Sequence, residues 1–145
     1  MFDNVCSCIR RAVWQQHPFK ATPIAEDLEW AMHVLLAGYR LAFTPSASVI
    51  HSHERNPRYE LDRTYLVHQR LRALFGVKTI SNPLKLVGVV AVTMAAHVRC
   101  LAGRHRPGIR EITRALALGL ALPLGQYLGA LSYDRSWQIL RPQGL

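Results

Sequence analysis

Two long runs without formal charge, Leu86–Val98 and Ala115–Tyr133, constrain the fold of this chain most. The first has thirteen residues, which as a helix span roughly 20 Å, less than the roughly 30 Å hydrocarbon core of a bilayer. The second has nineteen and could just span, although Pro123 and Gln126 weaken that interpretation. Three interpretations stay open: an interfacial helix hairpin, a membrane-spanning segment and a buried soluble core.

The charge of the chain is concentrated in the same half. Residues 76–145 hold nine basic residues and two acids, a net of +7, whereas residues 1–75 hold nine and seven, a net of +2. Five arginines lie between the two runs: Arg99, Arg104, Arg106, Arg110 and Arg114. A basic stretch beside apolar runs is typical of contact with an anionic membrane surface. Nucleic acid is not predicted as a partner, because the sequence has no helix-turn-helix, zinc-finger or RNA-binding signature.

The first half has a different pattern, which predicts mixed α/β structure. Apolar residues recur at Leu28, Met32 and Leu35, acids fill the first turn, and Gly38 follows, so we expect a helix over Ala25–Ala37. The remaining expected elements are strands at Tyr39–Phe43 and Ser48–His51, separated by Pro45, and a helix at Arg58–Phe75 with a basic exposed side. We therefore expect two parts, residues 1–76 and a helical, basic, membrane-associating tail over residues 77–145.

An ordered set of short motifs in residues 2–75 resembles the second half of the catalytic domain of family 2 glycosyltransferases. In order, these motifs are Cys8-Ile9-Arg10-Arg11-Ala12-Val13-Trp14, the aromatic Phe19, Glu26-Asp27 opening a helix, Gly38-Tyr39 ending it, and Pro45 before Val49-Ile50-His51. No single piece is specific, but the ordered set at these spacings is a fairly strong signal. Within the family the chain is most similar to bacterial rhamnosyltransferase-like members. The resemblance implies a GT-A fold, so the expected fold class is α/β: a partial GT-A fold followed by an amphipathic helical tail.

The resemblance also implies roles for four residues. Asp27 would be the general base that takes the proton of the acceptor hydroxyl in an inverting transfer, with Glu26 beside it orienting the site. His51 would complete the shell of a divalent metal, Mn or Mg, in the complete enzyme. Trp30 would offer its ring to an acceptor sugar. The partners implied are a nucleotide-sugar donor and a saccharide or lipid-linked acceptor.

Each of these residues also has a plainer interpretation. Acids in a first helical turn are often only partners of the helix dipole, which applies to Glu26 and Asp27. A histidine such as His51 is often a surface or loop residue. Trp30 lies on a helix and could be a core residue. At Phe19 the sequence His17-Pro18-Phe19-Lys20 departs from the family's usual Gly-Phe-Asp-Glu, so the acceptor loop differs.

No Asp-x-Asp motif, which holds the metal and the diphosphate in this family, occurs in the 145 residues. We therefore expect the chain to be the carboxyl-terminal part of a transferase, inactive alone, with no residues of its own for the nucleotide. An alternative is a non-enzymatic, basic, amphipathic membrane- or partner-binding module derived from such a fragment. Three cysteines without a signal peptide predict a reducing compartment. We expect a location at the cytoplasmic face of the inner membrane.

Overall fold

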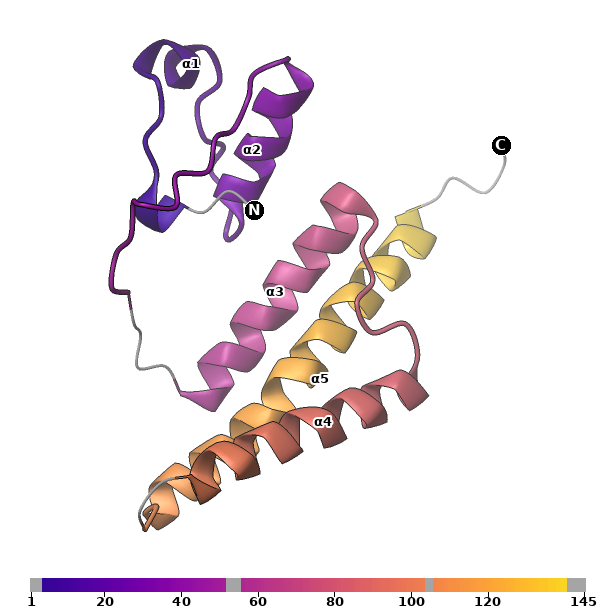
Figure 1. Ribbon diagram of the computed structural model, residues 1–145. Coiled ribbons are helices and arrows are strands. Elements are labelled where there is room, and N and C mark those ends of the chain that lie inside the picture. Colours follow the sequence, from indigo (N-terminus) through magenta and orange to yellow (C-terminus); the bar gives the residue numbers. More distant parts are fainter. Residues whose placement is uncertain (1–3, 52–55, 104–105, 141–145) are drawn as a thin grey trace. The chain divides into compact units, whose positions relative to one another are not determined.

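The computed structural model describes residues 4–51, 56–103 and 106–140 (Figure 1). The chain divides into two compact units, Met1–Glu54 and Arg55–Leu145. Every regular element in the described residues is a helix.

The first unit is built on one amphipathic helix. A short 3-10 helix, η1 (Asn4–Cys6), and α1 (Arg11–Gln16) precede the longer α2 (Glu26–Leu36). Trp30 and Val34, one turn apart on α2, are buried together with Ala31, and Ala25 is buried just before the helix. The helix expected at Ala25–Ala37 is therefore confirmed, but its core lies on a different face from the one that the spacing of Leu28, Met32 and Leu35 predicts, since Leu35 is 49 % exposed.

The expected α/β fold class, a partial GT-A fold, is wrong for this chain. The strands expected at Tyr39–Phe43 and Ser48–His51 are not formed: residues 40–51 lack regular structure apart from a turn at 45–46. A strand is stable only when a neighbour pairs with its N–H and C=O groups, and no second strand lies among the described residues. Phe43 is 89 % exposed, so its side chain has no apolar face to pack on. Local β propensity without a partner therefore does not produce a sheet.

The second unit consists of three helices, α3 (Pro57–Phe75), α4 (Pro83–Ala102) and α5 (Ile109–Leu140). The first two begin in the same way: an asparagine caps the helix and a proline follows. The side chain of Asn56 accepts a hydrogen bond from the Tyr59 N–H, and that of Asn82 accepts one from the Lys85 N–H, at 2.7 and 2.8 Å. Both caps fix where the chain turns into a helix. The helices expected at Arg58–Phe75, Leu86–Val98 and Ala115–Tyr133 are confirmed.

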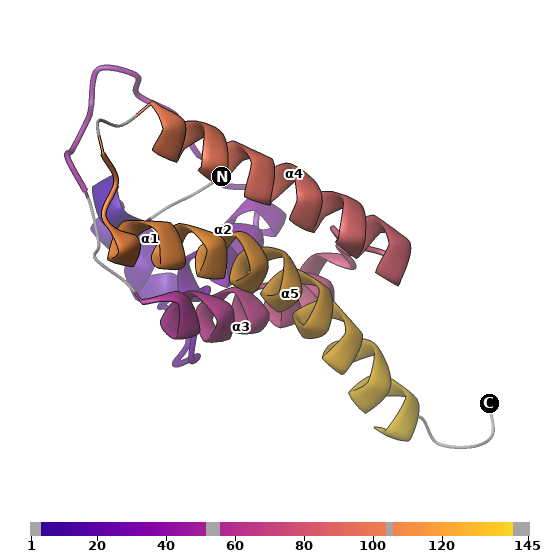
Figure 2. The ribbon, with the colours of Figure 1, turned by 90° about the horizontal axis from the view of Figure 1, so that it is seen from below.

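Helix α5 is the centre of this unit, because both other helices pack on it. Figures 1 and 2 show α4 beside the first part of α5 and α3 beside a later part. The buried residues include Ala121, Pro123 and Ala130 of α5, Thr64 of α3, and Ile80 from the connection between α3 and α4. Pro123 has no N–H to donate to the helix ladder, yet α5 runs through it.

The packing places α3 with the two apolar helices. The boundary expected after residue 76 was drawn on charge, and it coincides with the end of α3 at Gly76, whose φ of 67° stops the helix. The compact unit begins earlier, at Arg55. A functional boundary at residue 76 stays a prediction, but as a folding unit the apolar helices include α3.

Candidate functional site

The acidic pair opens helix α2, as expected. Glu26 and Asp27 lie in its first turn, after Ala25, which has a left-handed backbone with φ 60°. A non-glycine residue in this conformation costs on the order of 1–3 kcal/mol, and such strain is often found beside functional sites. Asp27 Oδ1 accepts a hydrogen bond from the Leu28 N–H at 2.8 Å, which leaves the carboxylate further acceptor capacity. Both acids are partly exposed, so a hydroxyl group can reach them.

The loop before α2 is fastened to the helix by aromatic contacts. The indole N–H of Trp30 donates to the carbonyl of His17, and the Trp30 ring packs against Phe19 with 5.3 Å between ring centroids. Trp30 is only 5 % exposed. This placement is what the core interpretation predicts for Trp30. Stacking on an acceptor sugar stays a prediction, and it would require the ring to be uncovered.

Two further contacts hold the same loop. Lys20 Nζ lies 3.1 Å from Glu29 Oε1, and the Glu29 side chain is only 8 % exposed. Tyr39 Oη donates to Gln16 Oε1 at 2.9 Å. The Lys20–Glu29 pair was not predicted from the sequence. Its signal is that Glu29 is a third acid in the first turn of an amphipathic helix, where a buried acid needs a basic partner. The contacts fix the start of α2 relative to the segment that contains Phe19.

His51 lies in the extended segment and its side chain is exposed. Among the described residues, no three His, Cys, Asp or Glu side chains come together as a metal site would require. The described residues therefore do not form a metal centre by themselves. The divalent metal and the role of His51 stay predictions about the complete enzyme. His53, the second histidine of the sequence His51-Ser52-His53, lies outside the described residues.

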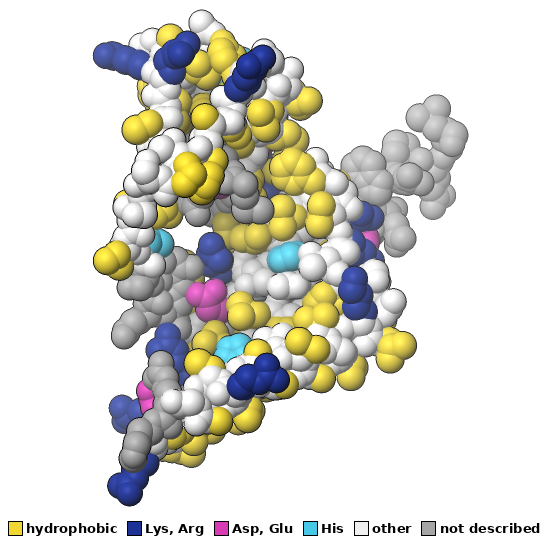
Figure 3. All heavy atoms as spheres, in the orientation of Figure 1, with side chains coloured by type: hydrophobic (Ala, Val, Ile, Leu, Met, Phe, Trp, Pro, Cys, Tyr) yellow, Lys and Arg dark blue, Asp and Glu magenta, His cyan; other side chains and the backbone are white. Residues whose placement is uncertain are grey.

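Helix α4 is the most unusual surface of the molecule. None of its twenty residues is buried. Leu84, Val87, Val92 and Val98 are 83, 66, 71 and 53 % exposed, which is large for apolar side chains. Figure 3 shows this face as a band of hydrophobic side chains along α4. An apolar helix face of this length is typical of an interaction with lipid or with another apolar surface.

Two uncharged polar residues of α4 are more covered than this apolar face. Thr93 and His97, one turn apart, are both partly covered, and Met94 beside them reaches Gly119 of α5. The Thr93 hydroxyl donates to the Val89 carbonyl, and His97 Nδ1 lies 2.8 Å from the Thr93 carbonyl. These two side chains are therefore partly covered and bonded to the helix's own backbone, whereas the charged Lys85 and Arg99 are exposed together with the apolar face.

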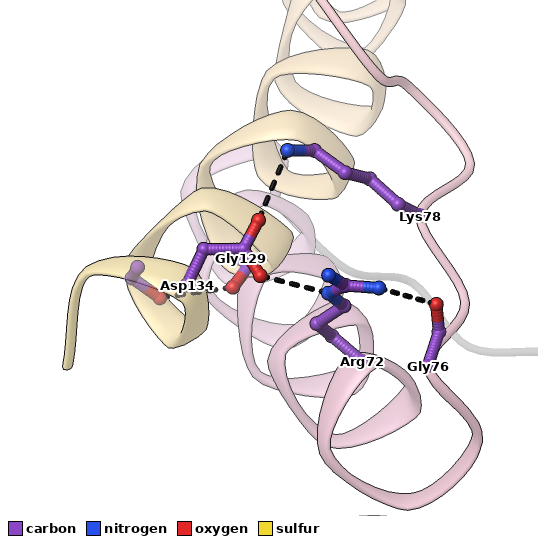
Figure 4. Close-up of polar contacts among 6 residues, drawn as sticks. Arg72, Gly76, Lys78, Gly129 and Asp134 are labelled. Carbon is purple, nitrogen blue, oxygen red and sulfur yellow. Dashed lines mark hydrogen bonds and ion pairs between the residues drawn. The ribbon is translucent and has the colours of Figure 1, made fainter. Parts of the chain in front are cut away.

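A ladder of polar contacts ties α3 to the end of α5 (Figure 4). Asp134 accepts from Arg72 Nε at 2.8 Å and from Lys78 Nζ at 3.0 Å. The hydrogen bond from Arg72, together with Lys78, holds the pKa of Asp134 below its ordinary value. One step along, Gln69 donates to the Ser132 hydroxyl. This ladder gives the second unit a polar end, opposite in character to α4.

Two helices, Pro83–Ala102 and Ile109–Asp134, are long and apolar enough to cross a membrane by length and composition. No protein-family model, curated protein or solved structure matches this chain. The likeness to family 2 glycosyltransferases therefore rests on the ordered motifs in the sequence.

Proposed function

We propose that this chain is the membrane-associating, acceptor-side part of an inverting glycosyltransferase that acts at the cytoplasmic face of the inner membrane. The observation that carries the proposal is helix α4, which exposes an apolar face along its whole length and buries none of its residues. Water penalises each exposed apolar side chain, and insertion into the boundary between headgroups and acyl chains removes that penalty. The five arginines between the two apolar runs, in residues 99–114, add attraction to anionic lipid.

The transferase part of the proposal is supported by the order of the motifs and by the place of Asp27. Its carboxylate is partly exposed in the first turn of α2, where the helix dipole favours negative charge. A base must carry that charge to take a proton from the attacking acceptor hydroxyl. The proposal includes no α/β fold for these residues. The nucleotide sugar and the divalent metal belong to the complete enzyme.

Membrane association is tested with the full chain and vesicles in a flotation gradient. The chain should float with vesicles of phosphatidylcholine and phosphatidylserine and bind pure phosphatidylcholine less. Raising the salt should weaken the binding to anionic vesicles without abolishing it, because the apolar part is not screened. A chain that stays at the bottom of the gradient at low salt would overturn this part of the proposal.

Transfer is tested in a reconstituted complete enzyme. Asp27→Asn should lower turnover on the order of 10²–10⁴-fold while donor binding stays close to normal. Glu60→Gln is the matched control, since Glu60 also lies in the first turn of a helix, α3. If Asp27 were only a partner of the helix dipole, both substitutions would leave turnover close to normal, and Glu26 would be the next candidate.

A second candidate is a non-enzymatic, basic membrane- or partner-binding module. It is favoured by the helical architecture and by the lack of a metal-binding group among the described residues. The two functions differ in what Asp27 does. A module that only binds membranes should keep all of its cellular function in the Asp27→Asn protein, whereas a transferase should lose it.

A further inference from the structure

Helices α3 and α5 touch through their backbones. A Cβ atom added to Gly125 would lie 2.8 Å from the Leu61 carbonyl oxygen and 3.1 Å from the Tyr65 nitrogen. One turn later, a Cβ on Gly129 would collide with the carbonyl oxygen of Tyr65. Contacts this close leave no room for lipid between the two helices, so α3 must accompany this part of α5 wherever it lies.

That contact excludes a spanning α5. Asp62 and Arg63 of α3 are exposed and lie beside the level of Gly125, within the stretch Ile109–Asp134 that could span. If α5 crossed the bilayer, it would carry these charges into the hydrocarbon, where charged side chains are strongly disfavoured unless they face a protein interior or water. They face neither a helix nor a core in the second unit.

Helix α4 is too short between its charges to span by itself. Lys85 and Arg99 are both exposed and lie fourteen positions apart, or roughly 21 Å along a helix. A hydrocarbon core is about 30 Å thick. Both charges can remain at the headgroups if the helix lies along the surface, where its length is not constrained.

The outward face of α4 has the spacing of a helix that lies on its side. Leu84, Val87, Ala91 and Val98 follow one another at helical spacing, and all are exposed. The end of the hairpin is strongly basic: residues 99–114 contain five arginines and one acid. Arg99, Arg106 and Arg110 are exposed there. An apolar stripe that ends in a basic cluster matches the boundary of an anionic bilayer.

We propose that the second unit is monotopic: α4 lies in the membrane–water interface with the stripe of Leu84, Val87, Ala91 and Val98 toward the acyl chains, and α3 stays in water. Helix α5 lies between the two. This inference rests on the membrane association proposed above and adds its orientation. The connection between α4 and α5, at one end of the hairpin, and the start of α4, at the other end, then lie on the same side of the bilayer.

The orientation is tested with the full chain carrying a single reactive cysteine. Cys6, Cys8 and Cys100, all exposed, are first replaced by serine. A cysteine is then placed at one end of the hairpin, Gly108→Cys, or at the other, Ser81→Cys. Both positions are exposed, and a Cβ at Gly108 meets no atom within 4 Å.

Each protein is bound to sealed phosphatidylcholine–phosphatidylserine vesicles, floated, and treated with a membrane-impermeant maleimide. The inference predicts complete labelling at both positions. A spanning hairpin would protect one end, or about half of each if insertion occurred in both directions, and that result would overturn the orientation while leaving membrane association intact. A chain that does not float would instead refute the association itself.

The lipid-facing stripe is tested by charge. Leu84→Asp and Val87→Asp are each expected to weaken vesicle binding about tenfold or more, because each removes an apolar contact and adds a charge that anionic lipid repels. Leu36→Asp, at an equally exposed apolar residue of α2, is the control and should leave binding unchanged. Circular dichroism of each protein establishes that the helices persist. Equal binding by the folded Leu84 and Val87 variants and by the control would exclude this face as the contact.

Discussion

The close approach of α3 and α5 makes Gly125→Ala the most informative substitution in this chain. The new methyl group would lie 2.8 Å from the Leu61 carbonyl oxygen and 3.0 Å from Thr64 Cβ. The carbonyl cannot rotate away as a side chain would, so α3 must move. Overpacking of this kind costs about 1–3 kcal/mol. Alanine also favours a helix over glycine by about 1 kcal/mol, which offsets part of that cost.

Two other glycines in helices separate these effects. Gly88 of α4 has open space around it, so Gly88→Ala should stabilise the chain by the helix-propensity difference of about 1 kcal/mol. At Gly119 the new methyl group would meet Met94 Sδ at 2.7 Å, the far part of a flexible side chain that can change rotamer. We therefore expect the order of stability Gly88→Ala, then Gly119→Ala, then Gly125→Ala.

The measurement is thermal unfolding followed by helical circular dichroism, in mild detergent and without vesicles. The Gly88 and Gly125 variants should differ by about 1–3 kcal/mol, which for a chain of this size corresponds to Tm values roughly 4–12 °C apart. Equal Tm values for these two variants would show that α3 does not pack on Gly125. Without that contact, α3 would not keep α5 out of the hydrocarbon.

Two further predictions concern how the stability of the chain depends on pH. Asp134→Asn should lower the free energy of unfolding by about 1–2 kcal/mol at pH 7, because Arg72 and Lys78 lose a charged acceptor. The pKa of Asp134 is lowered in the folded chain, so the difference from the native protein should disappear as the pH falls below 3.8 and through the folded-state pKa. Burial lowers the pKa of His68 from 6.5, so stability should fall as the pH drops below 6.5 toward the lower folded value, and His68→Gln should remove that part of the pH dependence in urea titrations. If the free energy of unfolding of a variant differed from that of the native protein by the same amount at every pH, the assignment of that residue, Asp134 or His68, would be contradicted.

The helices were predictable from local signals. Asn56-Pro57 and Asn82-Pro83 set the beginnings of α3 and α4, and Gly76 sets the end of α3. Each signal acts within one turn, so the sequence contains all of it. The start of α2 at Glu26 followed in the same way, from the acids and the spacing after them. The chemical role of Asp27 is a different matter, because it depends on a substrate that the local sequence does not describe.

The predicted strands were wrong because a strand depends on pairing with a partner from elsewhere in the chain. Val49 and Ile50 have high β propensity, but propensity for strands largely measures packing against neighbouring strands. Trp30 shows the same limit at the level of one side chain. Its spacing on α2 fits either a core or a sugar platform, and only the loop with His17 and Phe19 folding over it decides where the ring lies.

The helix that packs on α3 was not predicted from the sequence either. Its charges predicted a helix with one solvated side, which is correct for Arg58 and Arg63, but charge alone did not show what the other side packs on. The small residues Gly125 and Gly129 could have shown it, since this spacing permits backbone contact. Once α3 is placed there, the three interpretations of the apolar runs are no longer equivalent. A charged helix against α5 opposes spanning, the outward apolar face of α4 opposes a soluble core, and the interfacial hairpin is the arrangement compatible with both.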